Sequence, residues 1–569
     1  MGKNGRVSIL YPYEDVKFRQ LSRTACHDLG LDTICKELSE SADEQRLIMN
    51  VLSNMTDDMK TAQYRTEVFE DILGLSDMRK RMMELFEKIE FIRDYSSGRM
   101  ETDEKLGFWH LMHRLREIDD YIKYVEEMRA CLADEKIRSR GMLELRGYID
   151  ELYNEAHFEQ MKKDISELRS KSDTIQSVTL GVNVNDRFEA ISVGLVSVNS
   201  KQFKKSGIVG NFADAIASKD KVHDDTDWNG DMHYHQIDKI HDHELGVFVE
   251  GLGALNSVSS SGLMDNRIRA TVVNTIQGDN TSNTTFYLDK IMNKLLTSLV
   301  KKLRDVLSKY AEIAVVNISK LIPEFVYYIR MAEFVEKQTR RGFAFCRAQT
   351  TDGEGVSMDA RGLYNLKLAV SVENSADIVP NDLVFDKERR VYILTGANRG
   401  GKTTITQGIG LLYVLAQGGI YVPAQSFLYR PADAVYTHFP ADEDKTMDLG
   451  RLGEECVRFK EIYSECTEKS LVLLNETFST TSFEEGYYIA VDSVRALLKK
   501  GARTVYNTHM HKLAADTGSL GEGAASIIVK SDGGKRSFKV VAAPPEGLSY
   551  ARDIAEKYGV TYEMLTGEK

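Results

Sequence analysis

Residues 391–417 have the sequence VYILTGANRGGKTTITQGIGLLYVLAQ, in which a short apolar run, a glycine-rich loop and a longer apolar run follow one another. The loop, residues 396–403, fits the pattern G-x-x-x-x-G-K-[ST]. Glycines in this pattern let successive backbone N–H groups turn inward and hold phosphate at a helix N-terminus. We therefore predict a strand, a phosphate-binding loop and a helix, because a glycine-rich turn would rarely match all of these spaced positions by chance.

The side chains of this loop predict what it binds. Lys402 would neutralise the β and γ phosphates of a nucleotide, and the Thr403 hydroxyl would contact Mg²⁺. The sequence thus predicts ATP and Mg²⁺ as cofactors. The predicted nucleotide-binding residues are Gly396, Ala397, Asn398, Arg399, Gly400, Gly401, Lys402, Thr403 and Thr404.

A second apolar run, SLVLL at 470–474, ends in Asn475 and Glu476. At this place in P-loop enzymes an Asp holds the magnesium ion, and an acid orients or deprotonates the attacking water. Asn475 can still accept a hydrogen bond from a metal-bound water, but it brings no negative charge. We predict Thr403, Asn475 (through water) and Glu476 at the metal, with weaker Mg²⁺ binding and slower turnover than a carboxylate would give.

The runs VYILT and SLVLL are each followed by helical sequence, which is typical of a parallel α/β sheet. Upstream, residues 36–170 show the periodicity of helices with one apolar face. The segment SVTLGVNVNDRFEAISVGLVSV (177–198) alternates around an Asn-Asp turn and predicts a β-hairpin. A long helical pattern then covers about 288–337, with a kink or division expected at Pro323. Such a rod would either transmit motion or act as a passive strut.

Composition sets further bounds. The chain has 569 residues, too many for one hydrophobic core, so at least two domains are expected. Its formal charge of -12 means that any nucleic-acid contact must use a local patch. The six cysteines are scattered singly, as in a reduced compartment, and no apolar run is long enough for a signal peptide or a membrane span. We expect a cytoplasmic protein that does not bind membranes.

The C-terminal third resembles the ATPase domain of the MutS family. LTGANRGGKTTITQ (394–407) is similar to the phosphate loop of that family, GGIYVPA (418–424) to its Val-Pro-Ala segment, and NETFSTTSFEEG (475–486) to its Walker B and dimer-contact loop. THMHKLA (508–514) resembles its His-containing switch, and GLSYARDIAEKYGV (547–560) its closing Ser-Tyr helix motif. Upstream, the likeness extends to the helical core and the last lever helix of the family, through YRTEVFEDIL (64–73) and RMAEFVEKQTRRG (330–342).

The resemblance implies a fold with two parts: an α/β P-loop ATPase domain of the ABC and MutS type, and a mainly α-helical core and lever region with a small β-containing insertion. We expect no counterpart of the family's N-terminal mismatch-reading domain, because the helical pattern begins near residue 36. The predicted divisions are an N-terminal segment (1–35), a helical core and lever (36–175), an inserted clamp-like region of strands and loops (176–285), returning lever helices (286–348) and the ATPase domain (349–569).

The resemblance also implies roles and partners. Glu476 would be the catalytic base or water-positioning acid, and His509 would monitor the γ-phosphate. Two ATPase domains would pair as a homodimer, and the levers would close around duplex or branched DNA. In the family a Ser-containing signature reaches across this dimer. Here the corresponding stretch, DLGRLGEECVRFKEI (448–462), has no Ser or Thr, although Gly450 and Gly453 would still allow a helix N-terminus to face the phosphate.

Two other interpretations stay open. Asn475 is compatible with a nucleotide-gated protein-interaction scaffold that hydrolyses slowly or not at all, and an SMC-like ATPase would need far longer heptad runs. The insertion is also rich in His and Asp, and its His-x-His pairs could bind zinc or another transition metal, although we favour a solvated polar loop. Its histidines are His223, His233, His235, His241 and His243.

Overall fold

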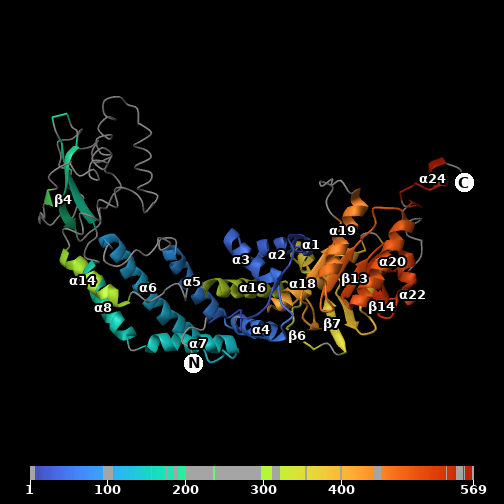
Figure 1. The fold of residues 1–569 in the computed structure, drawn as a ribbon, viewed down its shortest axis with the longest axis horizontal. Coiled ribbons are helices and arrows are strands. Elements are labelled where there is room, and N and C mark those ends of the chain that lie inside the picture. The colour runs from blue at the N-terminus through green and yellow to red at the C-terminus, as the bar shows by residue number, and fades with distance from the viewer. Residues whose placement is uncertain are drawn as a thin grey trace. The chain divides into compact units, whose positions relative to one another are not determined.

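The computed structural model describes residues 7–13, 15–93, 107–155, 157–172, 177–184, 186–187, 190–199, 235–236, 297–310, 321–352, 355–397, 400–440, 450–532, 535–545, 555–556 and 558–566. Its helices and strands are labelled in Figure 1. Contacts divide the chain into two compact units. Unit 1 comprises Met1–Glu84, Ala130–Tyr148 and Asn317–Lys569, and unit 2 comprises Leu85–Arg129 and Ile149–Val316. The divisions along the chain given above stay a prediction.

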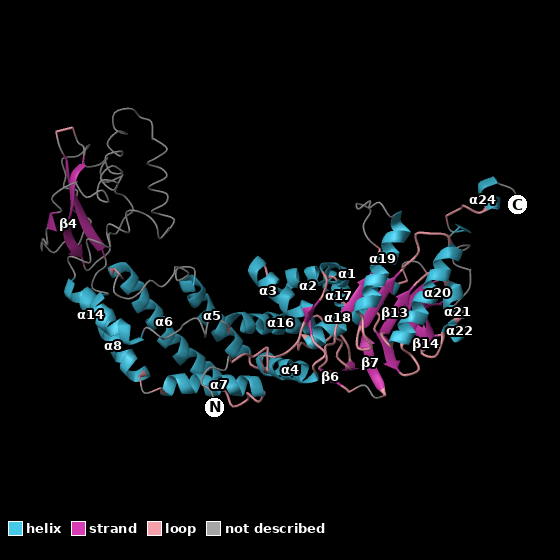
Figure 2. Cartoon of the chain, in the orientation of Figure 1, coloured by secondary structure: helices cyan, strands magenta, loops and turns pink. Residues whose placement is uncertain are grey.

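A six-stranded sheet forms the centre of the C-terminal part of unit 1, with the strand order β11-β12-β13-β9-β14-β15 (Figure 2). The first five strands are parallel, which confirms the predicted parallel α/β sheet, and β15 adds an antiparallel edge. The strands are β9 (Val391–Gly396), β11 (Val435–His438), β12 (Leu471–Asn475), β13 (Arg503–Asn507), β14 (Ala524–Asp532) and β15 (Lys535–Ala542).

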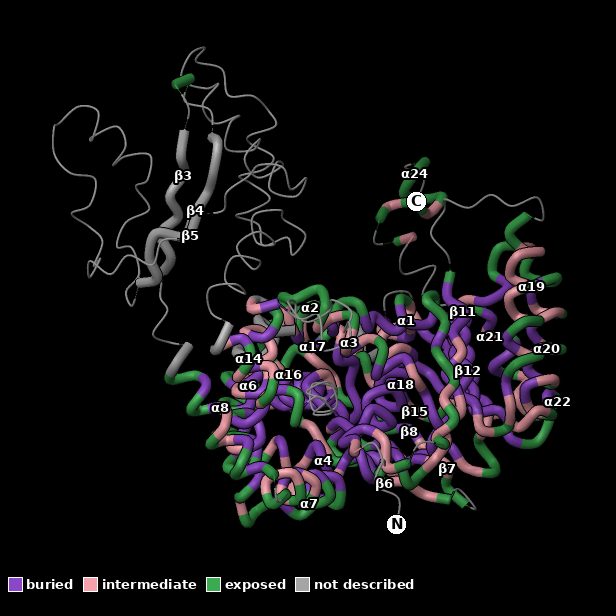
Figure 3. The backbone as a smooth tube through the Cα atoms, turned by 60° about the vertical axis from the view of Figure 1, so that its left-hand side comes forward, coloured by how far each residue is buried: buried purple, intermediate pink, exposed green. Residues whose placement is uncertain are grey.

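Helices cover both faces of this sheet because its side chains alternate between two apolar layers. Val391, Ile393 and Tyr506 are buried in one layer, against helices that follow the strands. These helices are α19 (Gly450–Glu465), α20 (Phe483–Lys500), α21 (His511–Ala515) and α22 (Thr517–Leu520). The other face contacts α18 (Lys402–Gln417) and α1 (Arg23–Leu29). Figure 3 shows the resulting run of buried residues through α18 and β12.

A second sheet, of order β6-β10-β7-β8, stands beside the first, and the sequence patterns did not predict it. Its one parallel pair joins β6 and β10, which are far apart in the chain. Its elements, together with two short helices, are β6 (Ala348–Thr350), β7 (Val356–Leu363), α17 (Leu366–Ser371), η3 (Ser375–Asp377), β8 (Asn381–Asp386) and β10 (Ser426–Tyr429).

Helices from the N-terminal part of the chain pack around α16 (Ile322–Arg340), which carries Pro323 in its first turn. Proline is tolerated there because its missing N–H is not needed. The predicted division of the long helical pattern thus coincides with the start of α16. The other elements of this helical part are β1 (Arg19–Gln20), α2 (Leu31–Leu38), α3 (Ala42–Ser53), β2 (Asn54–Met55) and α4 (Met59–Gly74).

Three helices belong partly to each unit: α5 (Ser76–Arg93), α6 (Phe108–Leu132) and α7 (Arg140–Asn154). Unit 2 also contains α8 (Phe158–Ser172), α14 (Thr297–Leu307), η2 (Ser308–Tyr310) and the strands β3 (Ser177–Val184), β4 (Ala190–Asn199) and β5 (His235–Gln236). β3 and β4 pair antiparallel, which confirms the predicted hairpin. The side chains of the His-rich stretch lie outside the described residues. A short helix near the C-terminus, α24, covers Tyr562–Thr566. Among the described helices, none has both the length and the apolar character required to cross a membrane.

Candidate active site

The glycine-rich loop lies between β9 and α18, at the carboxyl edge of the parallel sheet. Gly401 caps the helix with a φ of 95°, a left-handed conformation that glycine adopts without strain. An added Cβ there would also come within 3.3 Å of the Phe538 ring. The loop and the N-terminus of α18 therefore have the geometry of an anion-binding site. Of the predicted loop residues, Asn398 and Arg399 lie outside the described residues.

Lys402 is buried at the first position of α18. Its ammonium Nζ donates hydrogen bonds to two loop carbonyls, Gly396 O at 3.1 Å and Ala397 O at 3.3 Å. Burial lowers the pKa of Lys402, and the Glu476 carboxylate partly opposes that shift. A buried ammonium with so few partners is poised to gain from a negatively charged ligand.

Thr403 and Asn475 come together as predicted. The Thr403 hydroxyl, in the first turn of α18, donates a hydrogen bond of 3.0 Å to Asn475 Oδ1. A third residue, Asn507, joins them: its Nδ2 donates to the same Asn475 oxygen and lies 3.4 Å from Thr403 Oγ1. Asn475 ends β12 and Asn507 ends β13, and the two are register partners in the sheet.

Glu476 and His509 also meet. His509 Nε2 lies 3.0 Å from Glu476 Oε1, and both side chains are part-exposed. Glu476 has a φ of 54°, an unusual backbone conformation for a residue with a side chain, which is common at functional sites. The hydrogen bond from His509 lowers the pKa of Glu476, against the effect of burial. The carboxylate is therefore ionised at neutral pH, as a base or water-positioning group requires.

A cavity of about 510 Å³ opens beside the loop. Its lining includes the polar groups of Lys402, Thr403 and Glu476. The lining also has apolar and aromatic side chains, together with the polar residues of the same segments: Tyr364, Asn365, Leu368, Asp377, Ile378, Val379, Asn381 and Phe538. A cavity that combines a phosphate-binding loop with apolar and aromatic surface suits a nucleotide, which has a phosphate tail and a flat base.

His438, at the end of β11, holds the backbone just after Glu476. Its Nδ1 lies 3.2 Å from Thr477 Oγ1, and its Nε2 lies 3.3 Å from the carbonyl oxygen of Glu455 in α19. A carbonyl can only accept, so Nε2 carries the proton and Nδ1 accepts from the Thr477 hydroxyl. Burial lowers the pKa of His438 to about 4. His438 thus connects α19 with the loop that carries Glu476.

This buried histidine predicts a pH effect on stability. In the unfolded chain His438 takes a proton near pH 6.5, whereas the folded chain keeps it neutral down to about pH 4. Its contribution is therefore fully present above pH 6.5 and is lost as the pH falls toward 4, by up to about 1.4 kcal/mol per pH unit. We expect urea denaturation between pH 7.5 and 5 to show a steeper loss of stability for the wild type than for His438→Gln. Equal slopes for the two proteins would contradict this assignment.

The predicted signature segment begins at α19. Gly450 has a φ of 67° and no neighbour within 4 Å of an added Cβ, and the described part of the segment has no Ser or Thr in its first turn. Arg458 in the same helix contacts Asp28 of α1 at 3.1 Å, and Thr437 Oγ1 donates to the same carboxylate at 2.7 Å. The helix is therefore bonded to the helical part of unit 1. Most of the closing Ser-Tyr motif, 547–560, lies outside the described residues.

Sequence patterns missed Asn507 and His438. A signal for both was present, since each is a polar residue that ends a short apolar strand of the sheet, as Asn475 does. In a parallel sheet such strand ends meet at one edge, where ligands bind. Strand order is needed to place them side by side, and the sequence does not supply it.

Comparison with known proteins gives matches over most of the chain. Residues 57–337 match the model of the MutS2 N-terminal domain, and residues 392–555 match MutS domain V, a P-loop ATPase-type domain. The chain is 31% identical over 200 residues to the DNA mismatch repair protein MutS of Oleidesulfovibrio alaskensis, covering 34% of this chain and 22% of that protein. It is 31% identical over 190 residues to the endonuclease MutS2 of Thermus thermophilus, covering 33% of this chain and 25% of that protein.

A longer match, to the DNA mismatch repair protein MutS of Desulforamulus reducens, has 32% identity over 245 residues, 42% of this chain and 26% of that protein. The matches thus span about a quarter of the length of these relatives. The two domain matches occur in the order that the motifs predicted, helical part first and P-loop domain second. The phosphate loop, Glu476 and His509 all lie within the range that matches MutS domain V. We conclude that the chain belongs to the MutS family.

Proposed function

We propose that this protein is a MutS-like ATPase of DNA repair or recombination, in which ATP binding and hydrolysis move helical levers around duplex or branched DNA. The observation that carries the proposal is the site itself. Lys402, the N-terminus of α18 and Glu476 line one cavity that suits a nucleotide, and His509 contacts Glu476 at 3.0 Å. The names of the relatives support the proposed action on DNA, since two of them are called DNA mismatch repair proteins.

The residues present fit a magnesium ion bound with the nucleotide. The donors at this place are oxygens, from the Thr403 hydroxyl, the Asn475 amide and the Glu476 carboxylate, and oxygen is the ligand type that magnesium prefers. Such an ion would shield the charge of the phosphate tail. Thr403 would hold it directly, while Asn475 and Glu476 would accept hydrogen bonds from its waters. Glu476 would orient the attacking water, and His509 would respond to the γ-phosphate through its contact with Glu476.

Contacts at the far end of α18 support coupling between nucleotide and levers. Arg65 of α4 donates a hydrogen bond of 2.9 Å to Gln417 O, and Tyr327 of α16 donates one of 2.9 Å to Gly418 O. Gln417 Nε2 in turn donates to Thr56 O at 2.6 Å. The helix that begins at the phosphate loop is thus hydrogen-bonded at its other end to the helical part. A shift of α18 would therefore reach α4 and α16.

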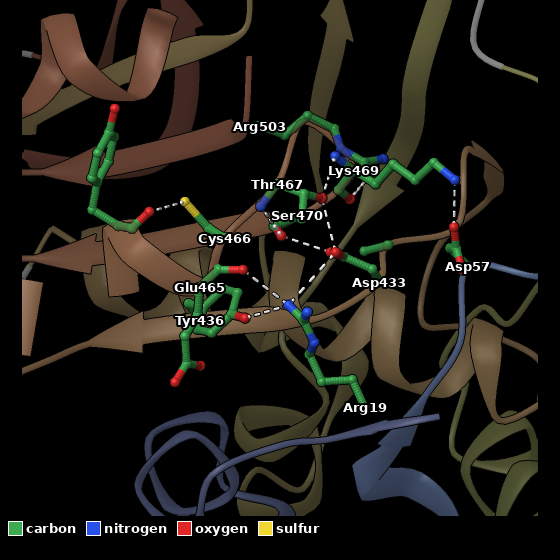
Figure 4. A network of polar contacts seen from close by, with 12 residues as sticks. Arg19, Asp57, Asp433, Tyr436, Glu465, Cys466, Thr467, Lys469, Ser470 and Arg503 are labelled. Carbon is green, nitrogen blue, oxygen red and sulfur yellow. Dashed lines mark hydrogen bonds and ion pairs between the residues drawn. The ribbon is translucent and has the colours of Figure 1, made fainter. Parts of the chain in front are cut away.

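A second set of contacts holds the opposite edge of the sheet, where the strands begin (Figure 4). Arg19, near the N-terminus, donates to Tyr436 Oη at 2.7 Å and to Glu465 O at 3.0 Å. Lys469 pairs with Asp57 at 2.5 Å, from the segment between β2 and α4. The helical part is therefore bonded both to the edge of the sheet where the strands begin and to the C-terminal end of α18, an arrangement suited to transmit rotation.

Exposed side chains on the ATPase domain support the homodimer. Phe483 and Tyr488, at the start of α20, are 53% and 71% exposed, and Val457 of α19 is 46% exposed. All three lie on helices that follow the carboxyl edge of the sheet. Pairing of two ATPase domains through this region would cover them.

Two measurements on one preparation test the proposal. Steady-state phosphate release should show slow but measurable ATP turnover, and binding to duplex and junction DNA should weaken steeply as salt rises. Lys402→Ala should lower the affinity for a fluorescent ATP analogue by at least about tenfold, because the buried ammonium contacts the phosphates. In that variant DNA affinity should no longer respond to ATP.

Other results would favour the scaffold interpretation. Nucleotide binding without turnover, together with no DNA binding at low salt, would point to a nucleotide-gated interaction protein. Failure of the wild type to bind any nucleotide at millimolar concentration would reject both interpretations.

A further inference from the structure

Asn507 presents an amide to the nucleotide site that no motif predicted. Its side chain is completely buried, and Asn475 beside it is only 5% exposed. Asn507 Nδ2 donates to Asn475 Oδ1, the same oxygen that accepts from Thr403 Oγ1 at 3.0 Å. One amide oxygen is therefore shared by two donors at the position where a metal-bound water would stand.

The two ends of an amide have opposite roles, which makes the orientation of Asn475 important. Its oxygen accepts hydrogen bonds, whereas its NH₂ group only donates them. A Thr403 hydroxyl that gives its lone pair to a cation must donate its proton to an acceptor. Asn475 meets that need only with its oxygen toward Thr403; with its NH₂ group there, it would compete with the cation for the hydroxyl lone pair.

We propose that Asn507 is a positioning residue that fixes Asn475 with its oxygen toward Thr403, and so allows a neutral amide to serve in the magnesium-dependent binding of nucleotide. Asn507 Nδ2 is a donor, so it pairs with the oxygen of Asn475 and not with its NH₂ group. This inference rests on the proposed function and adds a residue to the same site.

The state of the other end of Asn507 agrees with such a role. Its Oδ1 is buried and has no hydrogen-bond partner among the described residues. Turning both amides over would instead put the NH₂ group of Asn475 toward Thr403, where it could not accept the proton of the hydroxyl. In the observed arrangement the Thr403 hydroxyl and Asn507 Nδ2 both donate to Asn475 Oδ1, and Asn507 Oδ1 is left unpaired within the described part of the chain. The orientation of the Asn475 amide is therefore fixed, while Asn507 Oδ1 stays without a hydrogen-bond partner from the residues that the structure describes.

The test measures how much Mg²⁺ strengthens nucleotide binding. For each protein, the dissociation constant of a fluorescent ATP analogue is measured in EDTA and in Mg²⁺, and the ratio of the two is the metal dependence. Asn507→Ala frees the amide of Asn475 to turn, so we expect its metal dependence to fall by about two- to tenfold, the effect of one hydrogen bond. Thermal melting of each variant shows that the fold is retained.

A second background separates positioning from a general structural effect. In Asn475→Asp the side chain has two equivalent oxygens and no end that can point the wrong way. We expect Asn475→Asp to have a higher metal dependence than the wild type. When Asn507→Ala is added to Asn475→Asp, the metal dependence of the double variant should stay within about twofold of that of Asn475→Asp alone. Asn507→Ala should thus lower the metal dependence in the wild-type background and leave it nearly unchanged in the Asn475→Asp background.

Three outcomes would overturn the inference. A metal dependence that is equal in the wild type and Asn507→Ala would show that Asn507 does not orient Asn475. An equal loss in both backgrounds would show that Asn507 acts through packing. If the wild type bound no nucleotide in either buffer, the proposed function would fall and this inference with it, whereas the first two outcomes leave that function intact.

Discussion

Replacing Glu476 by Gln is expected to lower steady-state ATP turnover by at least about 100-fold, because general-base catalysis contributes about 10² to 10⁴ in rate. Gln keeps the shape of the side chain and can still contact His509, which lies 3.0 Å away in the wild type. It cannot accept a proton from the attacking water. Nucleotide affinity should stay within a few-fold of the wild type, since Lys402 and the loop are unchanged. Phosphate release and fluorescent nucleotide binding measure the two effects separately.

The matched control for this variant is Glu388→Gln. Glu388 is exposed in the turn between β8 and β9, so the same chemical change there should leave turnover at the wild-type rate. The low pKa of Glu476 also predicts that wild-type turnover does not rise between pH 6 and 8 through ionisation of this group. Unchanged turnover in Glu476→Gln, with nucleotide binding intact, would remove Glu476 from the catalytic role.

The parts of the fold that sequence predicts are those whose signal is local. β9, the loop and α18 follow one another without a break, so one apolar run, one glycine pattern and one helix predict them together. The β3–β4 hairpin is equally local, since a two-residue turn signal lies between alternating strands. Pro323 predicts a kink or a division of the helical pattern because its ring restricts its own turn and the preceding residue, and α16 begins there.

The remaining features depend on pairing between distant segments. β6 and β10 are about 80 residues apart, and each is so short that no periodicity marks it. Asn507 and Asn475 are likewise neighbours only because β13 lies beside β12. The patterns that placed Glu476 and His509 at the site came from motif resemblance, whereas their mutual contact required the fold. The charge of a residue is the weakest guide to whether its side chain is exposed, as Arg65 shows.

Arg65 is expected to be the residue of the helical part whose loss costs the most stability. In sequence it is an ordinary charged position of a helix, yet it is fully buried. Its Nε donates to Leu10 O at 3.0 Å, its Nη1 donates to Gln417 O at 2.9 Å, and its guanidinium lies over the rings of Tyr11 and Phe18. One side chain thus joins the N-terminal segment, α4 and the end of α18.

Arg65→Ala should therefore lower the free energy of unfolding by about 3 to 5 kcal/mol, through a cavity and two unpaired buried carbonyls. Arg65→Met fills most of the cavity but donates no hydrogen bond, so its loss should be smaller by about half. Arg46→Ala is the control, since that side chain is 78% exposed, forms an ion pair with the exposed Asp43 and donates to Ala42 O of its own helix, and it should cost less than about 0.5 kcal/mol. Urea titrations followed by circular dichroism compare the three variants with the wild type. A loss in Arg65→Ala no larger than that of Arg46→Ala would show that the carbonyls of Leu10 and Gln417 find other partners, and α18 would then have no fixed bond to α4 through which nucleotide binding could act.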